Sequence, residues 1–355
     1  MSKISFNNKQ NPFFKSLKSK VDTYFTETKR ESHGSQKLFI KGLIQVVSAL
    51  IIYTILVFFT PVWYVSILLC MLFGFNLAVI GFNIMHEGGH QTFSSYKWLN
   101  RLSAYSLNFL GGNAEFWRNK HNINHHTYTN IEGLDMDIEV KAMRMHANQQ
   151  WYSYHKLQHI YFIGLYSLAY IGWVYIQDFE KYFRGSLAPN QPKLAFSTKE
   201  HIIFWASKIG YTLVFVVLPF VLVGWYAIVG YLIICAVCGI TLSVVFQLAH
   251  VVEGTDFPEP NAVTNKIEQE WAIHQIQTTA NFSTGNRVLS WLLGGLNHQV
   301  EHHLFPRISH VHYPAISKMV KETCKEFNIN YIEFPTMFSA FRSHYSIIRS
   351  LGKAA

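Results

Sequence analysis

The sequence predicts an all-α integral membrane protein. We expect four transmembrane helices in two hairpins, with a cytosolic helical cap that holds a histidine-rich site for two metal ions. The 355-residue chain is 50% hydrophobic and only 14% charged, whereas soluble domains average about 25% charged residues. Lys and Arg are absent from two long hydrophobic windows, 42–96 and 209–265. Eight of the 18 histidines fall in three clusters, and these clusters predict the metal site.

Charge and cysteine usage narrow the class of protein further. The net charge of +9 lies outside the apolar windows, so it is typical of one face of a membrane protein and does not indicate a nucleic-acid partner. Four cysteines are too few for a disulfide scaffold in a chain of this length. The high hydrophobicity excludes a disordered chain.

The first 40 residues are polar and basic, and they have neither an apolar core nor a small-residue cleavage site. We therefore expect a cytosolic segment over 1–40 rather than a signal peptide, followed by the membrane domain at 41–355. Its first hairpin comprises helices over 43–60 and 63–85, divided at Pro61. At 1.5 Å per residue they reach about 27 and 34 Å, which matches a bilayer core of about 30 Å.

The second hairpin comprises helices over 202–224 and 227–250, with the turn near Gly224. Neither hairpin connection carries Lys or Arg, whereas the segments 86–201 and 251–355 are basic. The positive-inside rule therefore places these two segments in the cytoplasm.

A fifth apolar stretch, 159–176, is long enough to cross a membrane. One more crossing would place His250 and His126 on opposite sides and would spoil the charge asymmetry. We therefore expect this stretch to lie at the interface or to pack on the cytosolic cap.

Nine of the histidines form three clusters and one single site. The first cluster is His86-Glu-Gly-Gly-His90, whose i, i+4 spacing puts both rings on one helical face. The other two share the spacing HxxxHH, and His250 stands near the cytosolic end of the last helix. Their members are His121, His125 and His126, and His298, His302 and His303.

Imidazole is the commonest metal ligand in proteins near neutral pH. Eight or more imidazoles exceed the four ligands that one zinc ion takes, so the clusters predict two ions. Because imidazole suits Zn, Cu, Fe and Ni, the spacing alone leaves the metal open.

Two other classes of metal protein compete. The sequence HEGGH matches the HExxH signature of zinc metalloproteases, with Glu87 as general base. A protease needs only one further protein ligand, however, and would leave both HxxxHH clusters unexplained. A metal transporter would place its ligands in mid-membrane, and among the candidate ligands only His250 comes near that depth.

The clusters and the sequence around them resemble the membrane fatty acid desaturases, of the bacterial and cyanobacterial acyl-lipid type related to front-end Δ6 and Δ5 desaturases. Three histidine boxes stand in that family's order and spacing: HEGGH (86–90), FWRNKHNINHHTYTNIEG (116–133) and GGLNHQVEHHLFP (294–306). The flanking sequences VFQLAHVVE (245–253), WAIHQ (271–275) and ISHVHYP (308–314) are also similar. The resemblance covers nearly the whole chain from about residue 40.

The resemblance implies a four-helix membrane base, a cytosolic cap and a non-haem diiron centre. Carried over residue by residue, the iron ligands are His86, His90, His121, His125, His126, His250, His298, His302 and His303. Front-end relatives carry Gln at the position of Gln299, which is the alternative to His298. His274 and His312 are possible ligands or partners of ligands, whereas His33, His146 and His344 are expected to face solvent.

The implied activity is the introduction of a cis double bond into a long acyl chain, lipid-linked or CoA-linked, with O2 and two external electrons. The 355 residues contain no HPGG haem motif, so we expect a separate ferredoxin or cytochrome b5 as donor. The basic face suits an acidic donor and anionic lipids, at a bacterial inner membrane. Phe116, Trp117 and Trp291 are candidates for the wall of an acyl tunnel. A lipid hydroxylase or ketolase shares the boxes and is the nearest alternative.

Overall fold

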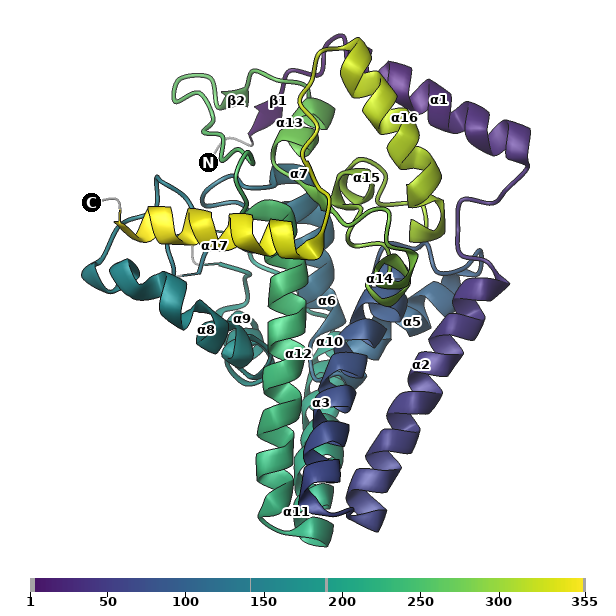
Figure 1. Ribbon diagram of the computed structural model, residues 1–355, viewed down its shortest axis with the longest axis vertical. Helices are drawn as coiled ribbons and strands as arrows, with labels where there is room; N and C mark the ends of the chain where they lie inside the picture. The colour runs from purple at the N-terminus through teal and green to yellow at the C-terminus, as the bar shows by residue number, and fades with distance from the viewer. Residues whose placement is uncertain (1–3, 141, 189–190, 354–355) are drawn as a thin grey trace. The chain divides into compact units, whose positions relative to one another are not determined.

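The computed structural model describes residues 4–140, 142–188 and 191–353, and these residues are mostly helical (Figure 1). Their β structure comprises two parallel pairs of two-residue strands. Strand β1 (Ser5–Phe6) pairs with β2 (Lys266–Ile267), and β3 (Asn281–Phe282) pairs with β4 (Glu333–Phe334). The predicted all-α fold is thus confirmed as a mostly helical one.

The helices are short around the histidine boxes and long in the apolar windows. In chain order the α-helices are α1 (Pro12–Thr28), α2 (Gln36–Thr54), α3 (Trp63–Ile80), α4 (His86–Gly89), α5 (Lys97–Phe109), α6 (Ala114–Trp117), α7 (His126–Tyr128), α8 (Gln158–Gly172), α9 (Asp178–Arg184), α10 (Thr198–Thr212), α11 (Leu218–Val223), α12 (Tyr226–His250), α13 (Trp271–Gln277), α14 (Arg287–Leu292), α15 (Gln299–Leu304), α16 (Tyr313–Glu326) and α17 (Met337–Lys353). Several continue through π-helical turns, namely η1 (Ile55–Phe59), η2 (Gly81–Met85), η3 (Arg118–His125), η5 (Trp173–Gln177) and η6 (Leu213–Val217). The 3₁₀ turns are η4 (Ser153–Leu157) and η7 (His310–His312).

The chain forms two compact units, each assembled from segments that are distant in the sequence. Unit 1 comprises the described residues of 1–33, 120–161 and 245–355, and unit 2 comprises those of 34–119 and 162–244. The third histidine box and most of the second lie in unit 1, and the first box lies in unit 2.

Five helices of the described chain are long and apolar enough to cross a membrane: Gln36–Phe59, Trp63–Gly89, Ser153–Arg184, Thr198–Val223 and Tyr226–His250. Four of them overlap the predicted spans, and they are interrupted at residues 60–62 and 224–225. The remaining helix, Ser153–Arg184, contains the stretch 159–176 and has the lowest mean hydropathy of the five, 1.3 against 2.0 to 2.5.

Unit 2 owes its close helix packing to glycine. Helix α2 continues through η1 and is followed, after residues 60–62, by α3, with which it is in contact (Figure 1). On α3, a Cβ at Gly74 would lie 2.5 Å from the carbonyl oxygen of Ile234 on α12. Glycine therefore lets the two backbones approach in the way that apolar spans do in membranes.

Unit 1 includes the N-terminal segment, which the sequence presented as a polar extension. Helix α1 lies beside α16 (Figure 1), and its residues Phe13, Leu17 and Val21 are buried in one core with Ile316 and Val320. Their i, i+4, i+8 spacing forms an apolar stripe on an otherwise polar helix, and this stripe attaches the segment to unit 1.

Two of the histidines that were expected to face solvent are buried instead. His146 is 2% and His344 is 1% exposed. The ring of His146 stacks on Phe257, with centroids 5.4 Å apart, and Nδ1 of His344 lies 2.6 Å from the carbonyl oxygen of Val251. An aromatic neighbour or a hydrogen bond thus replaces water at each ring.

The burial of His344 predicts a pH-dependent stability. Burial lowers the pKa of His344 to about 4 from an ordinary value of 6.5, and the hydrogen bond to Val251 offsets this only in part. Between these values the unfolded chain binds a proton that the folded chain does not. The free energy of unfolding should therefore fall on acidification, by roughly 2 kcal/mol from this residue at pH 5.

Thermal unfolding of the detergent-solubilised protein at pH 7 and pH 5 measures this effect. We expect a smaller drop in midpoint for His344→Gln than for the unchanged chain. Equal drops in the two proteins would show that His344 does not carry the pH dependence.

Candidate metal centre

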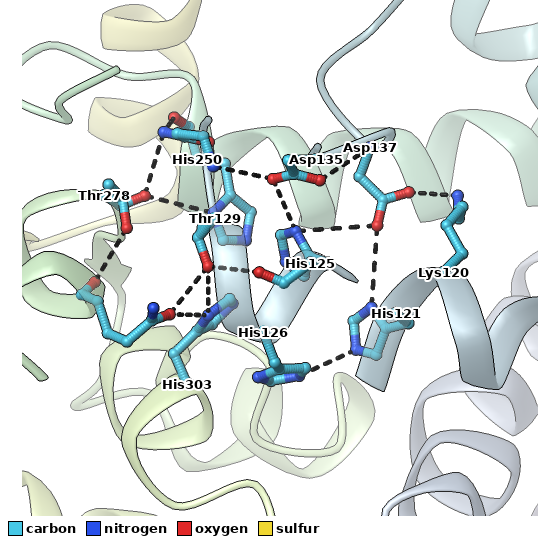
Figure 2. Close-up of polar contacts among 12 residues, drawn as sticks. Lys120, His121, His125, His126, Thr129, Asp135, Asp137, His250, Thr278 and His303 are labelled. Carbon is cyan, nitrogen blue, oxygen red and sulfur yellow. Dashed lines mark hydrogen bonds and ion pairs between the residues drawn. The ribbon is translucent and has the colours of Figure 1, made fainter. Parts of the chain in front are cut away.

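Three predicted ligands in unit 1 converge on one point (Figure 2). His125, His250 and His303 each offer a ring nitrogen within 4.8 Å of the other two. All three are buried, and they come from η3, the end of α12 and α15. Their ring centroids are 4.7 to 4.9 Å apart, so tertiary packing alone brings together residues that are up to 178 positions apart in the sequence (303 minus 125).

The outward nitrogens of these rings are held by hydrogen bonds. Nδ1 of His125 lies 2.9 Å from Oδ2 of Asp135, and Nδ1 of His303 lies 2.9 Å from Oε1 of Gln275. Nδ1 of His250 lies 3.4 Å from the carbonyl oxygen of Thr278. A ring that donates its Nδ1–H in this way carries its lone pair on Nε2.

Metal-binding histidines commonly donate their other ring N–H to a carboxylate or carbonyl group. The Nε2 atoms of His125 and His250 are buried and have no hydrogen-bond partner among the described residues. A metal ion would satisfy both nitrogens, so the three imidazoles fit an ion.

Asp135 is fixed on several sides. It is fully buried, and its Oδ2 also accepts the backbone N–H of Asn130 at 2.9 Å. Its Oδ1 accepts the N–H of Asp137 at 3.0 Å. Asp135 is not among the predicted site residues, although the alternating carboxylates of 133–139, directly after the second box, mark its position.

Asp137 lies between Lys120 and two ring nitrogens (Figure 2). Its carboxylate pairs with Lys120 and lies 3.9 Å from Nδ1 of both His121 and His125. Burial alone would raise the pKa of Asp137, but Lys120 and His121 outweigh it and hold the pKa well below its ordinary range. Burial lowers the pKa of His121 to about 4, which favours the neutral imidazole that binds metals.

A second group of imidazoles lies beside the first in unit 1. The Nε2 atoms of His121 and His126 are 3.3 Å apart, and the ring centroid of His302 lies 4.6 Å from that of His126. Nδ1 of His302 is 3.1 Å from the hydroxyl of Tyr313. Unit 1 thus gathers six of the predicted ligands in two neighbouring groups.

The first histidine box lies in unit 2. The rings of His86 and His90 are 4.7 Å apart between centroids, which confirms that they share a helical face. Both rings pack on Trp117, at 5.7 and 5.8 Å. A Cβ at Gly89 would overlap the indole of Trp117, and one at Gly88 would lie 2.5 Å from the backbone of α5. The paired glycines therefore permit a close approach at the box.

The start of the third box is arranged differently. His298 is buried, but its Nδ1 lies 3.7 Å from Oε2 of Glu301, and it is in neither converging group. Gln299, also buried, begins α15. Both stay predicted ligands.

The two remaining candidates contact the N-terminal segment. The ring of His274 packs 5.0 Å from that of Phe6, and Nδ1 of His312 lies 3.3 Å from the hydroxyl of Tyr24. The adjacent residue Gln275 is the one that contacts His303. The sequence WAIHQ therefore lies on the helix, α13, that contacts the metal centre. Gln275, however, is not among the predicted site residues.

The three aromatic residues that are candidates for the wall of an acyl tunnel lie in different surroundings. Phe116 packs on Phe196 and Phe204, and Trp291 is 43% exposed in unit 1. Of the three, Trp117 contacts the first histidine box.

Glu87 has partners that do not suit a protease. Its carboxylate accepts a hydrogen bond from Oγ1 of Thr92 at 2.8 Å and interacts electrostatically with Lys41. Glu87 and Lys41 are both buried. A general base must instead reach the proton that it removes.

Glu87→Gln is expected to lower stability and to leave chemistry largely intact. The variant leaves a buried ammonium group without its carboxylate, which is strongly destabilising. Turnover per bound metal should stay within a factor of about ten, whereas loss of a general base costs about 100- to 10,000-fold. Combining Glu87→Gln with Lys41→Met should restore the thermal midpoint. A folded double variant without turnover would show that Glu87 takes a direct part in the chemistry.

Helices that can span a membrane and two groups of buried imidazoles define a membrane protein with a histidine-rich candidate metal centre. The family description "Fatty acid desaturase" matches residues 60–335. The chain is 35% identical to a sn-1 linoleoyl-lipid 6-desaturase of Synechocystis sp., over 99% of both chains. It is 33% identical to the enzyme of that name from Arthrospira platensis, over 99% of this chain and 95% of the relative. It is also 33% identical to an acyl-lipid (8-3)-desaturase of Physcomitrium patens, over 96% and 72%.

This chain belongs to the fatty acid desaturase family, and it is an oxidoreductase. The family assignment agrees with the resemblance of the three histidine boxes.

Proposed function

We propose that this protein is a non-haem diiron acyl-lipid desaturase that introduces a cis double bond near the carboxyl end of a long acyl chain. The observation that carries the proposal is the convergence of His125, His250 and His303 with their outward nitrogens anchored. The names of the similar proteins, 6-desaturase and (8-3)-desaturase of acyl lipids, support a lipid-linked substrate and a front-end position.

In this proposal His125, His250 and His303 hold one iron, and His121, His126 and His302 are ligands of the other. The resemblance adds His86 and His90 to the ligand set. Bound iron supplies the O2-dependent oxidation that no side-chain acid or base can perform on an unactivated methylene pair.

The protein groups around these ligands set their orientation and exclude water. Asp135, Gln275 and the carbonyl of Thr278 fix the rings by holding Nδ1–H. The burial of these ligands and of Asp135 keeps bulk water from the rings, which strengthens the electrostatic interactions of the site.

We further propose four crossings, with both box-bearing segments on the cytoplasmic side. Three candidate spans separate His125 from His250, yet their rings are 4.7 Å apart. Residues on one side of a membrane are separated by an even number of crossings, and in this proposal one of the three therefore does not cross. Helix Ser153–Arg184 is the least hydropathic, and we assign it to the interface. The basic segments 86–201 and 251–355 support the cytoplasmic side.

The electron donor in this proposal is an external ferredoxin or cytochrome b5, and the membrane is the bacterial inner membrane. A basic cytoplasmic face attracts acidic donors and anionic lipids. Turnover with a purified donor should then fall as salt rises. Salt-independent turnover would count against electrostatic docking.

Expression in a host of defined fatty acid composition tests the activity. We expect new double bonds, located by mass spectrometry of the acyl chains, and about two iron ions per purified chain, since the imidazole ligands exceed the four that one zinc takes. Chelation should abolish activity, and ferrous iron should restore it. Hydroxylated or keto products would favour the alternative oxidation, and a single zinc ion would refute the diiron site.

A further inference from the structure

Unit 2 contains a buried ion pair that has no assigned role in the proposed reaction. Nζ of Lys208, on α10, lies 2.9 Å from Oδ2 of Asp178, at the start of α9, and both side chains are buried. Nζ also donates to the carbonyl oxygens of Gly111, at 2.6 Å, and Val174, at 2.7 Å. The three ammonium protons thus have three acceptors. Charged groups in helices apolar enough to span a membrane are costly and commonly mark function.

The other oxygen of Asp178 holds an indole. Oδ1 accepts the Nε1–H of Trp173 at 3.1 Å. Replacing a buried ion pair by apolar side chains is often neutral or stabilising, so the presence of the pair is weak evidence of a stabilising role. Its specific structural consequence is that Asp178, held by Lys208, fixes the orientation of the Trp173 ring.

The fixed indole leads to the first histidine box. Trp173 packs against the buried cluster of Met85, Leu107 and Trp117. Trp117 in turn packs on the rings of His86 and His90. Within unit 2, contacts therefore run without a break from the ion pair through two indoles to the box.

The indoles of Trp117 and Trp173 differ in burial, and this difference suits a surface that an acyl chain would contact. Trp117 is buried, whereas Trp173 is only partly buried against it. A saturated acyl chain offers no polar group near its reacting carbons, so only apolar surfaces can set its position. A rigid aromatic surface beside the box histidines provides such a limit.

We propose that Trp173 is a specificity-determining residue that, with Trp117, sets which methylene pair of the acyl chain lies at the metal centre. Asp178 and Lys208 are positioning residues that hold its ring. This inference rests on the proposed desaturase function and names the surface that selects the position of the double bond.

The first test compares Trp173→Ala with a matched control, Trp205→Ala. Trp205 also lies in unit 2 and also donates its Nε1–H to an oxygen, the Tyr182 hydroxyl at 2.9 Å, but it is outside the cluster at the box. The ratio of double-bond positions, or of acyl lengths accepted, should change by at least about tenfold in Trp173→Ala, since one methylene in an apolar pocket is worth that much. Trp205→Ala should keep the ratio, and both should keep their iron content.

An unchanged ratio in Trp173→Ala would overturn the inference, as would an equal change in Trp205→Ala. If the unchanged chain forms no double bond, the proposed function itself fails. A second measurement is independent of turnover: a diazirine-bearing acyl lipid, photolysed with the metal-free protein, should label the peptide that contains Trp117 or Trp173. Labelling of neither peptide, with a desaturase-active preparation of the same chain, would also overturn the inference.

The positioning role is tested by removing both charges together, as Asp178→Leu with Lys208→Met. The thermal midpoint should stay the same or rise, while the product ratio should shift in the direction seen for Trp173→Phe, which loses the same hydrogen bond. A residue pair with a merely structural role would lower the midpoint and keep the ratio. A double variant with the normal ratio would refute the positioning role.

Discussion

Replacing His303 with alanine is expected to abolish double-bond formation and to lower the iron bound per chain. His303 is one of three imidazoles whose nitrogens lie within 4.8 Å of one another. Alanine offers no ligand atom, and two histidines are too few protein ligands to hold an ion tightly. Elemental analysis of the purified variant and mass spectrometry of host acyl chains measure the two effects.

His344→Gln is the matched control for this experiment. His344 is as deeply buried as His303 and lies in the same unit, but it belongs to neither converging group and contacts Val251 instead. The control should retain iron and activity at pH 7. Retained desaturation by His303→Ala would remove His303 from the ligand set. Equal iron loss in both variants would show that burial, rather than ligation, explains the result.

Asp135→Ala should weaken iron binding by about 10- to 100-fold, the usual effect of losing a hydrogen-bonding partner of a metal-bound histidine. Asp135 accepts from Nδ1 of His125 at 2.9 Å and from the backbone of Asn130 at 2.9 Å. Without it, the His125 ring loses its fixed orientation and its preferred tautomer. Competition with a chelator of known affinity measures the change on the folded fraction.

Two further variants make the Asp135 result specific. Asp135→Asn keeps an oxygen that accepts the His125 proton, so its loss of affinity should be smaller. Glu253→Gln, a carboxylate of unit 1 that accepts from Ser346, should bind iron normally. Normal iron binding by Asp135→Ala would mean that the His125 ring is held by its packing alone.

Much of the fold could be predicted from patterns among neighbouring residues in the sequence. The predicted helix over 63–85 is found as a candidate span Trp63–Gly89, because an apolar run without charge is a property of neighbouring residues. Its end was placed four residues early, since the polar box HEGGH reads as an end of the apolar run. In the structure Glu87 is satisfied by Thr92, and the box continues the helix.

Properties that depend on contacts between distant segments could not be predicted from local sequence patterns. Asp135 and Gln275 escaped notice because their contacts with His125 and His303 exist only after the chain has folded. The burial of His146 and the packing of Phe13 into unit 1 depend on segments far away in sequence. By length and hydropathy, five helices could cross a membrane. The proposal of four crossings is supported by the proximity of His125 to His250, which only the folded chain shows.

The sequence by itself determined the class of this protein: apolar windows without charge, and histidines at ligand spacing in the order of the desaturase boxes. Both patterns involve residues that are close together in the chain, so they can be recognised without knowledge of the folded structure. The tertiary structure decided which imidazoles converge and which groups hold their outer nitrogens. It also joined Asp178 and Lys208 through Trp173 to the first box. Those relations arise from packing between segments, because burial and hydrogen-bond partners are properties of the folded chain.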